Sequence, residues 1–136
     1  MSFPDKPSDV YVELKAGQHL KFGHYPQTRE GNDHTPIEWI VLDSKDRKAL
    51  LISRYALDNQ CFSNRNDVLW ENSTIRAWLN DTFVENAFTC EEQQSIMTTE
   101  VDNSTRQYND EYIHIDGNIT RDKVFLLSET EATTYF

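Results

Sequence analysis

The sequence predicts an α+β fold in which a twisted antiparallel sheet packs against two or three helices. Three observations support this prediction: strand-like alternation before residue 53, helix-start signals after residue 72, and a concentration of aromatic residues between Phe22 and Phe88. Aromatic side chains bury large areas, so we expect that interval to hold the core. A chain of 136 residues fits one domain. We expect a flexible lead-in at residues 1–9 and a single domain at residues 10–136.

The first half of the chain carries the strand signals. Apolar and polar residues alternate over 10–14 and again over 20–22, which is typical of a strand with one buried face. Segments 37–42 and 49–52 are the best strand candidates, and the short polar connection 43–48 predicts an antiparallel hairpin. Because both faces of the first of these two strands are apolar, we expect it to be central in the sheet.

Helix starts are recognisable from capping patterns. A first helix begins after Asn72 or Ser73, either of which can cap it, and its apolar stripe continues to Phe83. Thr89 and Ser128 each have a glutamate three residues later, which is the capping-box pattern. The sequence therefore predicts two further helices after these residues.

Some polar residues near the core have a structural interpretation. Arg76 and Asn80 lie one helical turn apart, and we expect pairing with Glu71 or Asp81 rather than a catalytic role. Glu38 lies in a predicted strand, and we expect it to pair with a lysine or an arginine.

Acidic residues are concentrated toward the C-terminus. The net charge is −10, and residues 89–136 carry ten acidic against three basic side chains, a net of −7. Nucleic acid and anionic membranes require clustered lysine and arginine, so neither is an expected partner. The acidic charge leaves metal ions or a basic protein surface as alternatives, and most often such an excess only keeps a protein in solution. No stretch approaches the roughly 20 apolar residues of a membrane span, and the N-terminus lacks the pattern of a secretory signal. We therefore expect a cytoplasmic protein.

Segment 98–122 is polar and is expected to be a solvated surface loop, within which residues 112–115 can form a short strand before a turn at 116–118. A short buried strand is expected to follow at 124–127. Long loops in compact domains are usually functional or disordered. The residues expected to contact a partner are acidic side chains of this segment and the last two aromatic residues: Glu100, Asp102, Asp110, Glu111, Asp116, Tyr135 and Phe136. Ca²⁺ also prefers such oxygen-rich loops, but the spacing does not match an EF-hand, and we favour a solvated loop without metal.

The sequence contains no pattern that indicates a reaction. Cys61, Cys90, His24 and His114 are individually capable of nucleophilic or acid–base chemistry. No local signature surrounds either cysteine, and neither belongs to a Cys-x-x-Cys motif. We predict two free thiols, no catalytic site, no metal and no cofactor.

Several phrases carry a family resemblance. They are Phe-Gly-His-Tyr-Pro-Gln at 22–27, Pro-Ile-Glu-Trp at 36–39, Ala-Leu-Leu-Ile-Ser at 49–53, the tryptophan-flanked segment 70–80, Phe83, Ala87-Phe88 and the segment 123–132. Together they resemble a bacterial domain family of unknown function. That family is similar to the C-type-lectin-like fold shared with formylglycine-generating enzymes, in which strands and flanking helices support a ligand-binding loop region.

The resemblance also implies an incomplete fold. Members of that family usually continue with Trp-Trp-Leu-Arg-Ser-Pro-Gly and Gly-Val-Arg-Pro-Ala-Leu segments, and this sequence lacks both. A natural short variant, a truncated gene product and a half-fold completed by another chain are the alternatives. In the last case an open sheet edge would pair with another chain, a second copy included.

Two functions follow as expectations. The resemblance implies a non-enzymatic binding module. The acidic C-terminal third implies an alternative, a small acidic inhibitor of the kind that mobile elements encode, which mimics nucleic acid and docks on a basic nucleic-acid-binding protein.

Overall fold

The structure is a computed structural model that describes residues 2–4, 14–63, 69–103, 105–108, 111–114 and 118–136. These residues form an α+β fold, as the sequence predicts. The elements in chain order are β1 (Ser2–Pro4), β2 (His19–His24), β3 (Pro36–Lys45), β4 (Lys48–Ser53), η1 (Trp70–Asn72), α1 (Thr74–Trp78), η2 (Leu79–Phe83), α2 (Val84–Ala87), α3 (Cys90–Ser95), β5 (Thr99–Val101), β6 (Thr105–Tyr108), β7 (Glu111–His114), β8 (Thr120–Asp122) and α4 (Glu129–Tyr135).

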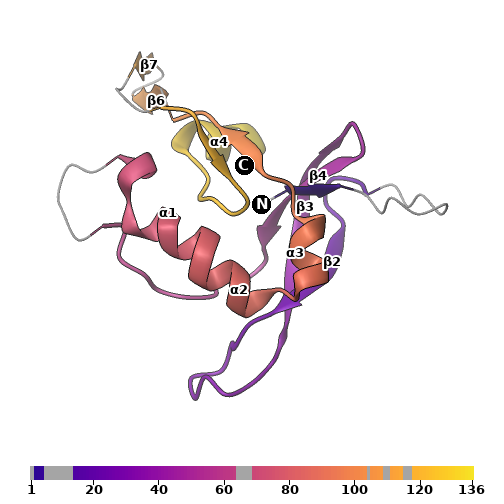
Figure 1. Cartoon of the computed structure of the whole chain (residues 1–136). Coiled ribbons are helices and arrows are strands. Elements are labelled where there is room, and N and C mark those ends of the chain that lie inside the picture. Colours follow the sequence, from indigo (N-terminus) through magenta and orange to yellow (C-terminus); the bar gives the residue numbers. More distant parts are fainter. Residues whose placement is uncertain (1, 5–13, 64–68, 104, 109–110, 115–117) are drawn as a thin grey trace.

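Within the described residues, four strands form an antiparallel sheet in the order β1-β4-β3-β2 (Figure 1). The prediction that β3 is central is confirmed. Its residues Ile37, Trp39 and Val41 are buried on one face, and a register shift between Val41 and Asp43 adds a residue opposite β4. Such a bulge increases the local twist of the sheet.

The predicted hairpin between β3 and β4 is confirmed, with a shorter turn than residues 43–48. Lys45 pairs with Lys48, which leaves Asp46 and Arg47 as the turn. Both turn residues have positive φ angles, 53° and 61°. This combination matches the two-residue turns whose twist suits antiparallel strands.

The three segments α1, η2 and α2 form one continuous helical run. Ser73 caps its start by accepting a hydrogen bond from the backbone N–H of Arg76, 3.2 Å away, as predicted. Helical dihedral angles at Leu79 and Val84 carry the run through η2, which is a π-helical segment. Leu79 and Phe83 are buried, so the predicted apolar stripe faces the core.

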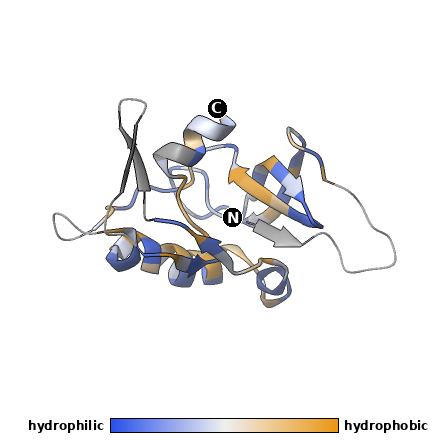
Figure 2. Cartoon of the chain, turned by 90° about the horizontal axis from the view of Figure 1, so that it is seen from above, coloured by the Kyte–Doolittle hydropathy of each residue, from blue (hydrophilic) through white to orange (hydrophobic). Residues whose placement is uncertain are grey.

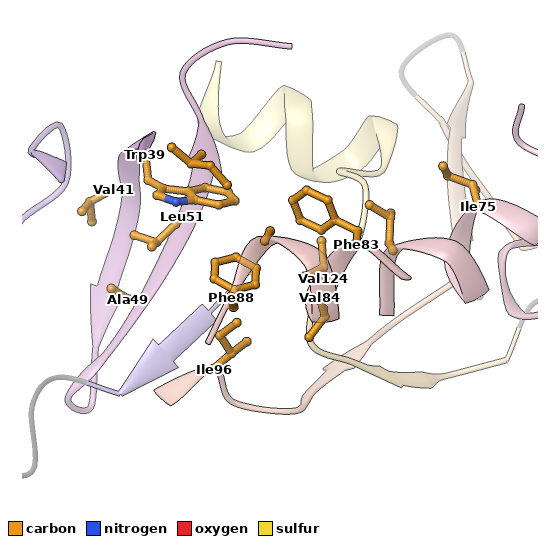
Figure 3. Close-up of a cluster of buried hydrophobic side chains, with 13 residues drawn as sticks. Trp39, Val41, Ala49, Leu51, Ile75, Phe83, Val84, Phe88, Ile96 and Val124 are labelled. Atoms are coloured by element: carbon orange, nitrogen blue, oxygen red, sulfur yellow. The ribbon is translucent and has the colours of Figure 1, made fainter. Parts of the chain in front are cut away.

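The core lies between the sheet and this helical run. Figure 3 shows Trp39 and Leu51 of the sheet on one side, with Phe83 and Phe88 on the other. The rings of Phe83 and Phe88 meet edge to face at 5.9 Å between centroids. Along the helical run, hydrophobic and hydrophilic residues alternate (Figure 2), which is typical of a helix with one buried face.

Gly23 lies where β2 meets the end of the helical run. Its φ angle is +74°, and a Cβ atom there would be 2.5 Å from a ring carbon of Phe88. The carbonyl of the preceding residue, Phe22, accepts a hydrogen bond of 2.7 Å from Nε1 of Trp39. Glycine at position 23 therefore permits β2 to approach the core aromatic residues closely.

The two predicted capping boxes are confirmed. Thr89 exchanges hydrogen bonds with Glu92 at the start of α3, and Ser128 does so with Glu131 at the start of α4. Thr89, the N-cap of the first of these helices, directly follows Phe88, which is buried. These local signals depend on residues three apart in sequence, which explains why they could be recognised without tertiary information.

Two predictions for the C-terminal third are wrong. Segment 98–122 was expected as a loop with a short strand at 112–115. Strand β7 (Glu111–His114) matches that strand, but the loop prediction is wrong for β6 and for the pair β5–β8. Segment 124–127 was expected as a buried strand, but no strand is assigned there, and Leu126 is 50% exposed. The side chain of Asn80 forms hydrogen bonds with backbone groups of Lys123 and Val124. A strand at this position would instead use such groups to pair with a neighbouring strand.

The predictions for residues 1–14 can be compared with the structure only where it describes the chain, at residues 2–4 and 14. Residues 5–13 lie outside the described residues, so the strand expected over 10–14 is described only at Leu14, which packs half-buried against the core. Within the expected lead-in 1–9, residues Ser2–Pro4 form β1 and pair with β4. Segment 20–22, with its alternating pattern, belongs to β2.

Candidate functional site

A groove with a volume of about 710 Å³ lies between the end of the β3–β4 hairpin, the β5–β8 pair and α4. We refer to it as the groove. Residues from four separate parts of the chain line it: Asp43, Lys45, Lys48, Ala49, Leu50, Met97, Thr98, Thr99, Glu100, Val101, Asp102, Arg121, Phe125, Ser128, Glu131 and Tyr135. Both charged and apolar residues belong to this lining.

The groove brings together part of the predicted partner-contact set. Glu100, Asp102 and Tyr135 all line it. Phe136 follows Tyr135 at the end of α4 and is 80% exposed. Sequence reasoning grouped these residues by charge and position, and the packing of α4 beside the β5–β8 pair puts three of them on one surface.

The remaining members of that set are not placed by the structure. Asp110 and Asp116 lie outside the described residues. Glu111 is the first residue of β7, where the backbone is described. The hairpin β6–β7 approaches α4 through β6, so this part of the chain lies near the same end of the molecule as the groove.

The groove is lined by both acidic and basic side chains. Arg121 and Glu100 form an exposed ion pair across the β5–β8 ladder, with 3.4 Å between nitrogen and oxygen. Burial, together with the negative charges of Asp43 and Glu131, raises the pKa of Tyr135 above its ordinary value. Tyr135 is therefore a neutral phenol at physiological pH, with both donor and acceptor capacity.

Sequence reasoning missed the basic side of the groove. Lys45 and Lys48 are direct partners in the hairpin and both line the groove. Like charges directly opposite each other in a sheet are destabilising. The sequence signal that could have found them is the two-residue turn Asp46-Arg47 between two lysines, since such a turn fixes their pairing.

A buried carboxylate fixes the position of β8, which forms one wall of the groove. Asp122 is 1% exposed. It accepts hydrogen bonds from Nε of Arg76 at 2.7 Å, Nε1 of Trp70 at 2.9 Å and the hydroxyl of Thr120 at 2.6 Å. A buried charge requires such pairing to be tolerated.

This arrangement corrects the predicted partner of Arg76. The guanidinium pairs with Asp122 and also donates to the backbone carbonyl of Glu71 at 3.2 Å. Asp81 was the other predicted partner, and it is exposed on the helical run. The true partner lies 46 residues further along the chain, which a helix-spacing argument does not reach. The prediction that Glu38 pairs with a basic residue is confirmed, since it binds Arg54 at 2.7 Å.

Further hydrogen bonds connect the buried carboxylate to the strand ends near the groove. The side-chain amide of Asn103 donates to the hydroxyl of Thr120 at 3.1 Å and to the carbonyl of Asn118 at 2.8 Å. The side chain of Asn118 in turn donates to Glu71 at 2.8 Å. Polar contacts therefore hold η1, β8 and the segment after β5 in one arrangement.

Asn80 attaches the segment that follows β8 to the helical run. Its Oδ1 accepts from the backbone N–H groups of Lys123 at 2.8 Å and Val124 at 3.1 Å, and its Nδ2 donates to the carbonyl of Val124 at 2.8 Å. The same Nδ2 donates to the carbonyl of Arg76 at 3.1 Å, four residues earlier in the helix. The side chain of Asn80 thus replaces a neighbouring strand as the hydrogen-bond partner of this segment.

The described residues contain no cluster of three or more His, Cys, Asp or Glu side chains that could hold a metal ion. Cys61 and Cys90 are free and exposed. In the same part of the chain, none of the helices has the length and apolar character needed to cross a membrane.

The fold and the groove define the chain as an α+β domain with a mixed-charge surface hollow. A model of the family described as Domain of unknown function (DUF6273) matches residues 46–135, and the chain belongs to this family. The match begins in the β3–β4 turn, so the core strand β3 lies before it. Comparison with curated proteins and with solved structures gives no match.

Proposed function

We propose that this chain is a non-enzymatic binding module that receives a basic segment of a partner protein in the groove. One observation supports the proposal above others: Glu100, Asp102 and Tyr135, which the sequence suggested as contact residues, line the same hollow. A negatively charged chain, with a net charge of −10, attracts a basic partner over a distance comparable to the Debye length.

The chemistry of the groove suits an extended, charged segment. Asp43, Glu100, Asp102 and Glu131 offer carboxylates to lysine or arginine side chains, and Tyr135 offers an aromatic surface with a polar tip. The lysines of the hairpin favour a segment that also carries an acidic residue. Opposite charges at fixed positions mainly provide specificity and fast association.

The scaffold proposed for this module is the C-type-lectin-like fold, acting in the cytoplasm. The resemblance in motifs supports it, and so does an antiparallel sheet flanked by helices. In the described part of the chain, β2 lies at one end of the sheet order. A second copy of the chain is therefore an additional proposed partner, joined through this edge. Light scattering tests this proposal, and a monomer at all concentrations would reject the dimer while leaving the groove proposal intact.

The alternative function is an acidic inhibitor that docks on a basic nucleic-acid-binding protein. The net charge of −7 over residues 89–136 favours it. A nucleic-acid mimic needs a continuous acidic surface, and the groove contains Lys45, Lys48 and Arg121 among its acids. The groove therefore gives more support to a binding module with a specific peptide-like partner.

The test uses two matched double variants in a pull-down from lysate of the source cell. Glu100→Gln with Asp102→Asn removes two charges from the groove. Asp81→Asn with Glu85→Gln removes two charges from exposed positions on the helical run, away from the groove. Binding is compared at low and high salt, with the bound proteins identified by mass spectrometry.

The proposal expects a protein with a basic segment that is retained by the wild type and by the helix variant but lost from the groove variant. Loss from both variants to the same extent would indicate an unspecific charge effect and reject the groove. Recovery of nucleic-acid-binding proteins that dissociate at high salt from all forms alike would favour the inhibitor.

A further inference from the structure

A second hollow, of about 410 Å³, lies between the end of β4, the 57–62 loop, the helical run and segment 124–127. We refer to it as the apolar pocket. Its volume falls in the range of roughly 300–1,000 Å³ that is usual for small-molecule sites. Most of its lining is apolar or aromatic: Trp39, Leu51, Ile52, Ser53, Leu57, Asp58, Gln60, Phe62, Ile75, Trp78, Leu79, Phe83, Val124, Phe125, Leu126 and Leu127.

The apolar pocket has a buried floor and an exposed apolar rim. Trp39 and Phe83, which belong to the lining, are 4% and 3% exposed, whereas Phe62 and Leu126 are 47% and 50% exposed. The rim side chains come from two segments far apart in sequence. A ligand that enters from the rim would cover both of these segments. Burial of their exposed apolar surface would then contribute to the free energy of binding.

Asp58 is the one ionisable side chain among the described residues that line the apolar pocket. Its carboxylate is held in place by the hydroxyl of Tyr25, by the backbone N–H of Asn59 at 2.7 Å and by the side-chain amide of Gln60 at 3.2 Å. These bonds fix a negative charge beside aromatic walls.

The carboxylate of Asp58 is ionised at neutral pH. Partial burial acts to raise its pKa, but the hydrogen bonds from Tyr25, Asn59 and Gln60 outweigh this effect and leave the pKa below its ordinary value. Burial and the neighbouring Asp58 raise the pKa of Tyr25 to about 12, so the phenol keeps its proton and continues to donate to the carboxylate.

We propose that the apolar pocket binds a small organic cation with an apolar body, whose positive group lies beside Asp58 while the body fills the space under Phe62 and Leu126. Charge complementarity identifies this class of ligand. Cations are attracted both by the carboxylate and by the faces of aromatic rings, whereas an anion would meet Asp58 and a chain of net charge −10.

This inference is separate from the groove proposed for a protein partner. The two hollows share Phe125 as a lining residue, and all their other lining residues differ. Their charged residues differ, so each hollow can be altered without changing the other. Failure of one proposal therefore leaves the other standing.

The experiment uses three probes with the same six-carbon body: hexylammonium, hexanol and hexanoate. Amide shifts are followed by two-dimensional NMR during titration of the full chain. Leu51, Ile52 and Leu127 report on the apolar pocket, and Lys48 and Glu100 report on the groove. We expect saturable shifts at the pocket residues, with hexylammonium binding roughly two- to fivefold more tightly than hexanol and hexanoate binding least tightly.

Matched variants locate the two parts of the site. Asp58→Asn keeps an acceptor for Tyr25 and should remove the preference for hexylammonium over hexanol, whereas Asp43→Asn in the groove should not. Leu126→Ala should weaken all three probes by roughly threefold. Ile119→Ala, which shortens an aliphatic side chain that is 61% exposed elsewhere, should leave affinity unchanged. Equal affinities for the three probes, shifts confined to the groove, or an unchanged preference in Asp58→Asn would overturn the proposal.

Discussion

The indole N–H of Trp70 donates to the carboxylate of Asp122 over a sequence separation of 52 residues. The same carboxylate pairs with Arg76, whose side chain is 30% exposed while that of Asp122 is 1% exposed. Both donors come from the start of the helical region and the acceptor from β8. This contact therefore ties η1 and α1 to β8, the strand that forms one wall of the groove.

Substitution Asp122→Asn should destabilise the fold substantially. It removes the negative charge between Arg76 and Trp70, and breaking a buried ion pair costs about 3–5 kcal/mol when both groups are buried. Because Arg76 is partly exposed, we expect a loss of about 2–3 kcal/mol in the free energy of unfolding, measured by urea denaturation. Arg121→Gln on the same strand loses only an exposed pair and should change stability by less than about 1 kcal/mol. Equal effects from the two variants would show that burial of Asp122 does not matter.

Substitution Gly23→Ala should be costly for two reasons, and Gly17→Ala separates them. Both glycines have positive φ angles, but the added Cβ meets Phe88 at 2.5 Å in the first case and nothing within 4 Å in the second. We expect Gly17→Ala to lose about 1 kcal/mol from backbone strain. Gly23→Ala should lose at least about 2 kcal/mol more, because overpacking is added. Thermal and urea unfolding measure both values, and similar losses would argue against close packing at Phe88.

Substitution Asn80→Ala should release segment 123–127 from the helical run. Three hydrogen bonds to Lys123 and Val124 are lost, at a net cost of about 1 kcal/mol each at most. Amide hydrogen exchange should accelerate at Lys123 and Val124 and remain unchanged in β3. Asn80→Asp is the control, because it keeps the acceptor for both amides and should protect them better than alanine does. Unaltered exchange in Asn80→Ala would contradict the role assigned to this side chain.

Lowering the pH should destabilise the loop between β2 and β3, because protonation of Asp33 weakens the hydrogen bonds that its carboxylate accepts there. The hydroxyls of Thr28 and Thr35 and the backbone N–H groups of Gln27 and Thr28 donate to its carboxylate and hold its pKa well below the ordinary value. A lowered folded-state pKa adds stability that is complete above the unfolded pKa, which is near 4, and that is lost as pH falls below it. Unfolding measured between pH 5 and pH 2 should therefore show a steeper decline for the wild type than for Asp33→Asn. Parallel declines would reject this contribution.

Local signals made most of the fold predictable. The capping residues Ser73, Thr89 and Ser128 act within one helical turn, and the apolar faces of β3 are visible in its own sequence. Continuous apolar runs predicted β3 and β4, because a strand that is covered on both faces is apolar on both sides. Short-range chemistry therefore defined the element types well.

Pairings between distant segments were not predictable in the same way. The bond between Asn80 and Val124 gives no local pattern, so segment 124–127 looked like a buried strand on hydrophobicity alone. The polar strands β5 and β8 looked like a loop, because exposed strands lack a strong apolar signal. For the candidate site, Glu100, Asp102 and Tyr135 were recognised by charge and position, whereas Lys45 and Lys48 depend on the register of the hairpin.

The π-helical segment Leu79–Phe83 has a consequence for how this domain can change over time. A π turn holds about one residue more than an α turn, because its hydrogen bonds connect residues five apart rather than four apart. Removing one residue here would therefore convert the widened turn to regular α-helix and leave the orientation of the helix beyond it nearly unchanged, so that Val84 and Ala87 would stay buried. Deletion of one residue should be better tolerated within Leu79–Phe83 than within the regular turn Val84–Ala87, where it would rotate the residues on either side by about 100° relative to each other.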